Sequence, residues 1–266
     1  MKTRLLTTLA TLLLALTSWA YGVEIDGIYY VLNSSTNTAI VARYTSSTNN
    51  NPNALYKGNI AIPASVSYGG TAYRVTKIGN YAFDGCSSLT SVSIPSSVTT
   101  IGDGAFNKCK GLASISIPNR VTSIGNEAFF WCFGLKRVSI PASVTKIGNY
   151  AFCGCTGLTS ISIPSSVTKI GEDAFRGCSS LTDIYARHTD PEAYHCPDYA
   201  FSDVPFSTCI LHVPTGSKEA YANTEPWSKF KNIVAGAAQT ARHPVQSQTH
   251  KQKGARKVGS NTKKSK

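Results

Sequence analysis

Five consecutive copies of a 23-residue block occupy the middle of this 266-residue sequence. The first copy, IGNYAFDGCSSLTSVSIPSSVTT, runs from residue 78 to residue 100. A fixed period of roughly 20 to 50 residues indicates a solenoid, in which each unit buries its apolar side only against its neighbours. The repeated isoleucines are Ile78, Ile101, Ile124, Ile147 and Ile170, and the repeated phenylalanines are Phe83, Phe106, Phe129, Phe152 and Phe175.

Each copy contains one short stretch typical of a strand. Leu89, Val92 and Ile94 follow the spacing L-x-x-V-x-I, and the serines between them place alternate side chains on the opposite face. Pro95 ends the stretch, because proline has no N–H to donate to a strand ladder. The rest of the copy is rich in Gly, Ser and Thr, so we expect mostly turns or short 3₁₀ pieces on this return limb. Gly102 and its equivalents there are expected to adopt a backbone angle that other residues resist.

Stacking the copies would bring equivalent side chains to about 4.8 Å, the spacing of hydrogen-bonded strands. We therefore expect the repeated phenylalanines to form a column inside the stack. Disulfides are common in exported chains, but cysteines at one repeat position have parallel Cβ vectors, which suit a disulfide poorly. Free, buried thiols are predicted for the five repeated cysteines, which are Cys86, Cys109, Cys132, Cys155 and Cys178.

Three further cysteines lie at other positions. Cys153 occupies a repeat position that is polar or aromatic in the other copies, so we expect it to be exposed. Cys196 and Cys209 lie near the end of the stack, where they could form a disulfide or remain free. Together with His195 and His212 they could imitate a four-ligand zinc site, but the spacings match no established pattern. No metal site and no cofactor are therefore predicted.

The complete repeat pattern, I-G-x-x-A-F-x-x-C-x-x-L-x-x-[VI]-x-I-P-x-x-V-T, resembles the BspA-like class of leucine-rich repeats of bacterial surface proteins. The resemblance covers about residues 60 to 214. It implies a leucine-rich-repeat stack with short parallel β-strands, a role in adhesion or protein binding, and no enzyme activity. The asparagine familiar from other leucine-rich repeats is replaced here, which argues against an asparagine ladder. The residues near its place are Ser97, Arg120, Ser143 and Ser166.

The sequence on either side of the repeats differs from them in character. Lys2 and Arg4 precede an apolar run of 12 residues, which indicates a secretory signal and is too short to span a bilayer stably. A solenoid also needs caps, because its end units would otherwise expose apolar surface and unpaired strand edges. The expected segments are a signal peptide at 1–20, an N-terminal β cap with a first partial repeat at 21–74, the five repeats at 75–186, a degraded repeat with a C-terminal cap at 187–234, and a basic disordered tail at 235–266.

The N-terminal cap is predicted to contain two hairpins. Strand-like runs at 25–32 and 39–44 are separated by a polar segment and should pair with each other. The segment 60–63 imitates the end of a repeat strand, and the sequence YGGT at 68–71 is typical of a tight turn. These elements would cover the first coil of the solenoid.

The C-terminal cap is predicted from weaker signals. Residues 199–201 are a degraded sixth copy of the Tyr-Ala-Phe in the first repeat. A short helix is expected after Ser217, which would be its N-cap. Trp227, Phe230 and Ile233 then provide apolar side chains that could close the stack.

The net charge of +12 is concentrated at the end of the chain. Residues 235–266 hold eight basic and no acidic residues, whereas the body between residues 21 and 234 has a net charge of only +2. The tail could make weak, non-specific contacts with anions. It lacks aromatic residues on which bases could stack, so no specific nucleic-acid recognition is predicted.

The third repeat departs from the others and provides the candidate binding site. Where the first copy has Asp84, Gly85 and Ser87, the third has Phe130, Trp131 and Phe133. At strand positions that are small and polar in most copies, it has Lys136 and Arg137. Aromatic residues together with arginine are typical of protein-binding hot spots. The alternative is that these rings pack against a neighbouring turn and have only a structural role.

The predicted function is binding by a secreted or surface-exposed protein, with no catalysis. The sequence has no Gly-rich phosphate loop, no nucleophile elbow and no recurring pair of carboxylates, and its serines lack a His and Asp partner within the repeats. The resemblance implies an extracellular-matrix or cell-surface protein as the partner, and no membrane span remains after signal cleavage. Two alternatives stay open: a structural component of the cell envelope without a discrete ligand, and a carbohydrate-binding surface protein.

Overall fold

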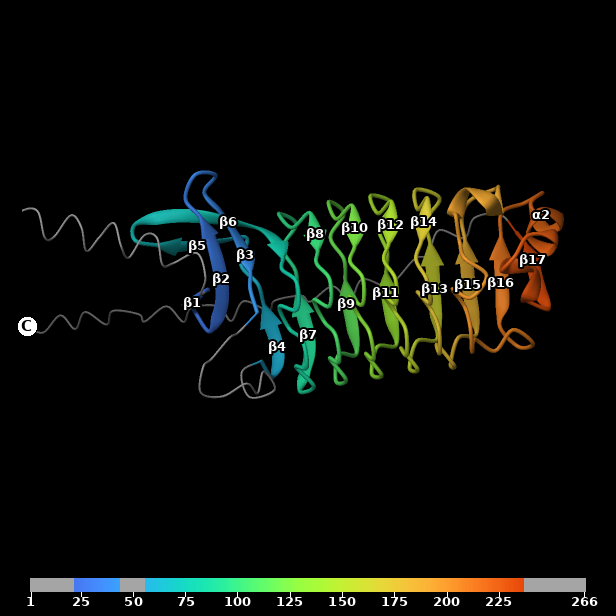
Figure 1. The fold of residues 1–266 in the computed structure, drawn as a ribbon, viewed down its shortest axis with the longest axis horizontal. Coiled ribbons are helices and arrows are strands. Elements are labelled where there is room, and N and C mark those ends of the chain that lie inside the picture. Colours follow the sequence, from blue (N-terminus) through green and yellow to red (C-terminus); the bar gives the residue numbers. More distant parts are fainter. Residues whose placement is uncertain (1–21, 44–55, 237–266) are drawn as a thin grey trace, which may run out of the picture.

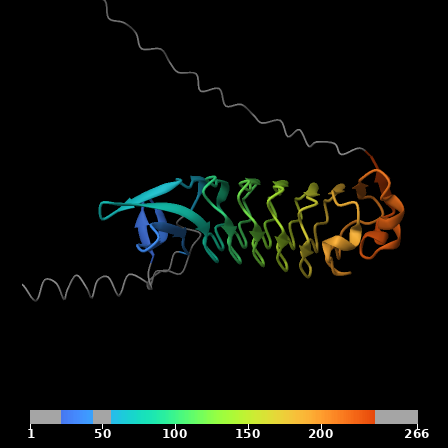
Figure 2. The ribbon, with the colours of Figure 1, turned by 90° about the horizontal axis from the view of Figure 1, so that it is seen from above.

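The repeats wind into an elongated stack of coils in the computed structural model, which describes residues 22–43 and 56–236 (Figure 1). The N-terminal strands cover one end of the stack and the C-terminal cap covers the other (Figure 2). The predicted signal peptide at 1–20 lies outside the described residues, as does the predicted tail from residue 237 onward. The structure therefore shows the predicted solenoid with both of its ends covered.

One strand of each coil joins an eight-stranded sheet, called here the front sheet. Its strands pair in parallel, and between the repeats the register equals the 23-residue step, so that Arg137 lies beside Ser114 and Val138 beside Ile115. This confirms the strand that the spacing of Leu89, Val92 and Ile94 predicts. In order, the strands are β4 (Gly58–Ala61), β7 (Leu89–Ser93), β9 (Ser114–Ser116), β11 (Arg137–Ser139), β13 (Ser160–Ile163), β15 (Asp183–Ala186), β16 (Ile210–Val213) and β17 (Asn232–Ala235).

The return limb forms a second parallel ladder, which the sequence did not predict. Besides the expected turns, each coil contributes a two-residue strand that ends at the repeated isoleucine. The buried isoleucines stack, and the backbone beside them pairs between coils, with Gly102 N donating to Ile78 O at 2.9 Å. This return sheet contains β8 (Thr100–Ile101), β10 (Ser123–Ile124), β12 (Lys146–Ile147) and β14 (Lys169–Ile170).

The predicted column of phenylalanines runs through the interior and gains a sixth member, Phe201. Successive rings lie 5.1 to 5.5 Å apart and within 3° to 6° of parallel, and all six are fully buried. Tyr56 covers the first ring edge-on at 4.9 Å, and Trp227 covers the last at 5.1 Å. Aromatic side chains from the two caps therefore close the column at both ends.

The repeated cysteines are free and buried, as predicted. From the second repeat onward, each thiol donates to the carbonyl oxygen of the phenylalanine in the preceding repeat, and Cys132 Sγ lies 3.1 Å from Phe106 O. Burial raises the pKa of the Cys132 thiol well above its ordinary value. Cys196 and Cys209, for which a disulfide was an open alternative, are also free.

The prediction that Cys153 is exposed is wrong, because only 9% of its surface is accessible. The cysteine side chain is shorter than those of Phe130 and Arg176, which occupy the same position in the repeats on either side. Long side chains at this position reach solvent, as the exposed Arg176 does, but a cysteine does not. Burial also raises the pKa of its thiol.

The prediction that Gly102 and its equivalents adopt a backbone angle that other residues resist is also wrong. Gly102 is not among the residues with a positive φ. Its position is instead crowded by the preceding coil: a Cβ added at Gly125 would lie 2.5 Å from the carbonyl carbon of Gly102, and one added at Gly148 would lie 2.5 Å from Asn126 N. Glycine is required here because the backbones of two coils approach closely.

Asparagine and aspartate side chains do form a ladder, but at a different repeat position from that of Ser143 and its equivalents. It lies two residues after each repeated isoleucine, where a side-chain oxygen accepts the backbone N–H of the next coil. At the position where the familiar asparagine is replaced, Ser143 Oγ instead donates to Val121 O at 2.7 Å. The side-chain Oδ1 of each residue accepts from a backbone N–H one coil later: Asn80 from Asp103 (3.1 Å), Asp103 from Asn126 (2.7 Å), Asn126 from Asn149 (2.9 Å) and Asn149 from Glu172 (3.1 Å).

The N-terminal cap contains both predicted hairpins. The first pairs β2 with β3, and the second pairs β5 with β6 through a turn that places Tyr68 opposite Thr71. The strand β3 then pairs in parallel with β6, which joins the cap to the return sheet. The bounds are β1 (Val23–Ile25), β2 (Ile28–Asn33), β3 (Thr38–Val41), β5 (Ser65–Tyr68) and β6 (Thr71–Ile78).

The C-terminal cap contains the predicted short helix, α2 (Lys218–Asn223), and two 3₁₀ turns, η2 (Pro191–Tyr194) and η3 (Trp227–Lys229). Ser217 occupies the N-cap position, but its hydroxyl donates to Pro214 O at 2.8 Å instead of capping the helix. Tyr194, Tyr221 and Trp227 are fully buried beneath these elements. In the part of the chain that the structure describes, no helix is long and apolar enough to cross a membrane.

Candidate binding surfaces

The three aromatic residues that the sequence singles out lie at one edge of the solenoid, where each coil turns toward the front sheet. The backbone there needs a left-handed residue seven positions after each repeated isoleucine. Equivalent side chains of successive coils form a row along the edge, called here the edge row. Its members are Gly85, Lys108, Trp131, Gly154, Gly177 and Asp203, with φ between 57° and 73°.

Trp131 lies between two other rings at this edge. Its centroid is 4.9 Å from that of Phe130 and 6.2 Å from that of Phe133, with interplanar angles of 18° and 29°. Trp131 is 43% exposed and Phe133 is 40% exposed. An ideal Cβ at Gly154 would lie 2.4 Å from Trp131 Cδ1, so the indole rests on that glycine in the next coil. The rings are therefore partly packed on a neighbouring turn and partly accessible to a partner.

Two lysines that the sequence analysis did not select lie over these rings. Lys108 Nζ is 6.0 Å from the centroid of Trp131, and Lys110 Nζ is 5.7 Å from that of Phe133. Each lysine precedes its ring by one repeat of 23 residues, so the stacking of equivalent positions brings them together. That step was a signal in the sequence that could have identified both contacts. Cation–π contacts of this kind orient the ammonium groups toward the aromatic edge.

Lys136 and Arg137 lie on the front sheet rather than against the rings. Arg137 is exposed in β11, between Ser114 of β9 and Ser160 of β13. Among the described residues, neither side chain stacks on an aromatic ring or pairs with a carboxylate. The structure thus brings Phe130, Trp131 and Phe133 together, and it places the two predicted cations on the adjoining face.

A groove of about 370 Å³ adjoins Trp131 on the side of the C-terminal cap. Arg176 lies at its far end, paired with Asp203 at 3.3 Å and with Asp173 at 3.6 Å. Most of its lining is aromatic, glycine or thiol, so the groove is apolar near the indole and charged at the opposite end. The lining residues are Phe130, Trp131, Tyr150, Cys153, Gly154, Arg176, Gly177 and Asp203.

A second group of large side chains lies on the front sheet near the C-terminal cap. Tyr185 of β15 stacks on His212 of β16, with the ring centroids 4.3 Å apart. The guanidinium of Arg187 lies 5.0 Å from the centroid of the Tyr185 ring. His212 Nε2 is 2.7 Å from Asp183 Oδ1. These contacts fix the four side chains against one another at the end of the front sheet near the C-terminal cap.

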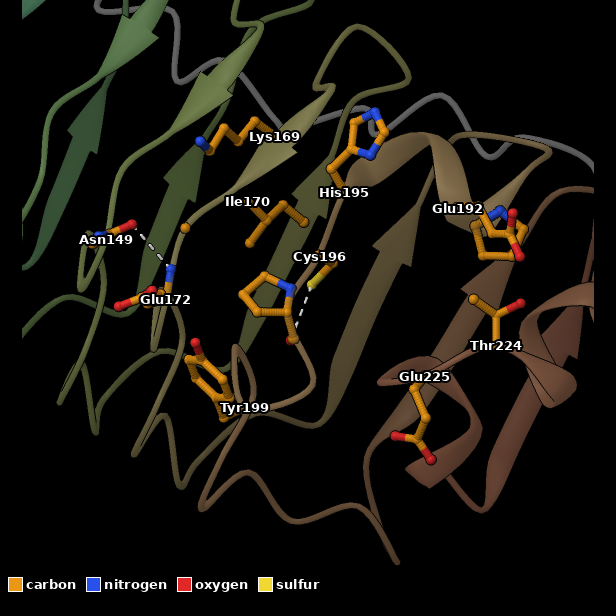
Figure 3. Close-up of a pocket in the computed structure, with 13 residues that line it drawn as sticks. Asn149, Lys169, Ile170, Glu172, Glu192, His195, Cys196, Tyr199, Thr224 and Glu225 are labelled. Carbon is orange, nitrogen blue, oxygen red and sulfur yellow. Dashed lines mark hydrogen bonds between the residues drawn. The ribbon is translucent and has the colours of Figure 1, made fainter.

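A cavity of about 560 Å³ lies between the return sheet and the C-terminal cap (Figure 3). Glu172 and Asn149 come from the repeats, whereas Glu192 and Glu225 come from the cap (Figure 3). The charge of Glu172 is the main cause that raises the pKa of the exposed Tyr199. The sequence analysis missed this cavity because residues distant in sequence form it.

The side chains considered for a zinc site do not converge. Cys209 is buried, His212 pairs with Asp183, and His195 and Cys196 line the cavity beside the cap. Within residues 22–43 and 56–236, no three His, Cys, Asp or Glu side chains are placed to hold a metal ion.

Comparison with known proteins identifies the repeat. A family model described as BspA type leucine rich repeat region matches residues 76–212 in six copies, the sixth being the degraded copy that contains Phe201. No curated protein matches the chain.

Among solved structures, a leucine-rich-repeat protein of T. pallidum is 28% identical, with a TM-score of 0.53 over 72% of this chain and 86% of that chain. One from Bacteroides ovatus is 23% identical, with a TM-score of 0.55 over 82% of this chain and 72% of that chain. The fold of this chain is therefore that of known bacterial leucine-rich-repeat proteins.

Proposed function

The chain belongs to the BspA-type leucine-rich-repeat family, and from this premise we propose that it is an exported protein that binds other proteins through one edge of its solenoid. The partner would be an extracellular-matrix or cell-surface protein. The charged and apolar run at residues 1–20 supports export. The proposal includes no catalytic step.

One observation carries the proposal: two accessible aromatic side chains lie side by side where the preceding repeat has Lys108 and Lys110 and the following repeat has Gly154 and Thr156. Trp131 is 43% exposed and Phe133 is 40% exposed, and lysines lie over both rings. Tryptophan is among the residues most enriched at interface hot spots. A purely structural role would be expected to bury these rings more completely.

The experiment is a binding screen against immobilised matrix proteins, cell-surface proteins and glycans, using protein that lacks residues 237–266 so that tail contacts do not contribute. Hits are retested with Trp131→Ala combined with Arg137→Ala. The matched control combines Thr156→Ala with Ser160→Ala, because these residues occupy the positions of Phe133 and Arg137 one repeat later.

The proposal requires a protein ligand whose binding falls at least about tenfold in the first double variant and stays unchanged in the control. Binding that survives in both variants, or a screen in which no protein binds, would contradict it.

A second candidate function, carbohydrate binding, has one observation in its favour. Tyr199 is 47% exposed at the cavity beside the cap, where the carboxylates of Glu172 and Glu192 also lie. An aromatic ring with nearby polar groups is suited to a small polar ligand. The glycan arm of the same screen, repeated with Tyr199→Ala, tests this function separately.

A further inference from the structure

The edge row has a gap directly beside Trp131. Lys108 and Trp131 fill two successive positions, but the next two are Gly154 and Gly177, and the row resumes only at Asp203. Trp131 leans over Gly154, so that glycine is covered. At Gly177 an added Cβ would meet only the backbone of Gly154, at 3.7 Å. The groove of about 370 Å³ therefore opens over Gly177, with the indole as one wall.

The size and lining of this groove suit one large apolar side chain. Its volume lies near the lower end of the roughly 300 to 1,000 Å³ found for ligand pockets. The polar groups at its far end, Arg176 and Asp203, already pair with each other at 3.3 Å. A sugar would need several unpaired polar partners close to the ring, whereas an apolar side chain needs only the indole and the glycine floor.

The charge around the rings indicates what should accompany that side chain. Residues 106–137 hold one carboxylate, Glu127, against five basic residues. Lys108 and Lys110 lie over the rings on the side away from the groove, and in the described structure neither pairs with a carboxylate. An acidic segment of a partner would complement this surface.

We propose that this edge recognises an extended protein segment that carries acidic residues three to four positions from an aromatic or large aliphatic anchor. The anchor stacks on Trp131 above Gly177, and the acidic residues contact Lys108 and Lys110. The spacing follows from the coils: Lys108 lies two coils from Gly154 and three from Gly177, roughly 10 to 14 Å, and an extended chain advances about 3.3 Å per residue. This inference rests on the proposed function and specifies its partner.

The test uses fluorescence anisotropy with the labelled peptide Glu-Glu-Ser-Gly-Trp-Gly-Ser-Glu-Glu, which reads the same in both directions and so needs no assumption about orientation. Two control peptides replace the Trp by Ala or the four Glu by Lys. We expect binding by the first peptide at low salt, at least about tenfold weaker binding by each control, and loss of affinity as NaCl rises.

Two variants at Gly177 locate the anchor. Gly177→Gln should fill the groove and weaken the binding of the acidic Trp peptide at least about tenfold. Gly177→Ala has the same backbone conformation but adds little volume, and it should change binding less than about twofold. Side chains are tolerated in this row, since Lys108 and Trp131 both have φ of 57°. Lys108→Gln with Lys110→Gln should reduce both the affinity and its dependence on salt.

Equal binding of the Trp and Ala peptides, equal binding of the Lys peptide, or unchanged affinity in Gly177→Gln would overturn the inference. If no peptide binds but a protein ligand depends on Trp131 and Arg137, the proposed function stands and this inference fails. If glycans bind in a manner that depends on Trp131 and no peptide or protein does, both fail.

Discussion

The interior of the solenoid and its aromatic edge differ in how much equivalent residues vary from one coil to the next. In the interior, equivalent residues are identical or closely similar: six phenylalanine rings stack at 5.1 to 5.5 Å, and from the second repeat onward each repeated thiol bonds to the carbonyl of the preceding repeat. At the edge, equivalent residues differ widely in size and charge, and the row passes from Lys108 to Trp131 to Gly154. Both regions use the same stacking geometry, but only the edge is free to vary.

The difference follows from burial. A buried position faces the same environment in every coil, so a change in one coil leaves a cavity or a clash against its two neighbours. An edge position faces solvent on one side and tolerates any side chain that accepts the backbone angle. We therefore expect changes in the interior to alter stability and changes at the edge to alter binding.

A loss of stability in alkali is expected from the interior thiols, and it adds over all of them. Burial raises the pKa of Cys132, Cys155 and Cys178 well above 9.0, so these thiols ionise in the unfolded chain before they ionise in the folded one. Their contribution is complete below pH about 9 and falls as the pH rises, by about 1 kcal/mol or more per thiol for each unit.

Urea unfolding between pH 7 and pH 10 measures this loss. A flat profile above pH 9 would contradict the account, and Cys132→Ala should reduce the slope.

Phe129→Ala is expected to cost about 3 to 5 kcal/mol in the free energy of unfolding, because it leaves a cavity between two rings that the stacked coils hold apart. Phe133→Ala, at the edge of the same coil, should cost less than about 1 kcal/mol. Urea denaturation of the two variants makes the comparison. Similar losses in both would remove the distinction between interior and edge.

Gly125→Ala should destabilise the protein by about 2 to 3 kcal/mol, since the added Cβ would lie 2.5 Å from the backbone of Gly102, which cannot move aside. Gly177→Ala introduces a less favourable backbone angle, but its Cβ would meet only the backbone of Gly154 at 3.7 Å, an ordinary contact distance, and we expect a cost of about 1 kcal/mol. Thermal unfolding followed by circular dichroism separates the two. The reverse order would show that backbone angle matters more than the approach of the coils.

Asn126→Ala removes one step of the side-chain ladder on the return limb and should cost about 1 kcal/mol, because the N–H of Asn149 loses an acceptor but remains accessible to water. Asn126→Asp keeps an acceptor and should lie within about 0.5 kcal/mol of the wild type. Hydrogen exchange at the amide of Asn149 reports the lost bond directly. An unchanged exchange rate in Asn126→Ala would show that the ladder contributes nothing there.

The sequence predicts the interior well because periodicity reports burial directly. The fixed step of Phe83 and Cys86 is enough to place both in columns, once coils are assumed to stack. Local chemistry similarly locates the Tyr68 to Thr71 turn. Why Gly102 must be glycine could not be inferred from periodicity or local chemistry. It depends on how closely the backbones of two coils approach, and the spacing of residues in the sequence does not give that distance.

The candidate site is only partly visible in the sequence for a similar reason. Phe130, Trp131 and Phe133 are unusual within their repeat and could be selected by comparison with other copies. Neighbours along the chain suggest Lys136 as their partner, but the contacts that form run between coils and bring Lys108 to Trp131 instead. The groove over Gly177 depends on side chains that are absent from two successive coils, so it appears only when the row is assembled.

Trp131→Ala is expected to alter binding strongly and stability little. Its unfolding free energy and its affinity for a protein ligand found in the screen should be measured on the same preparation. The account predicts a free energy within about 1 kcal/mol of the wild type and an affinity reduced at least about tenfold. A loss of several kcal/mol with unchanged affinity would contradict it, because Trp131 would then belong to the packing of the solenoid and not to a binding surface.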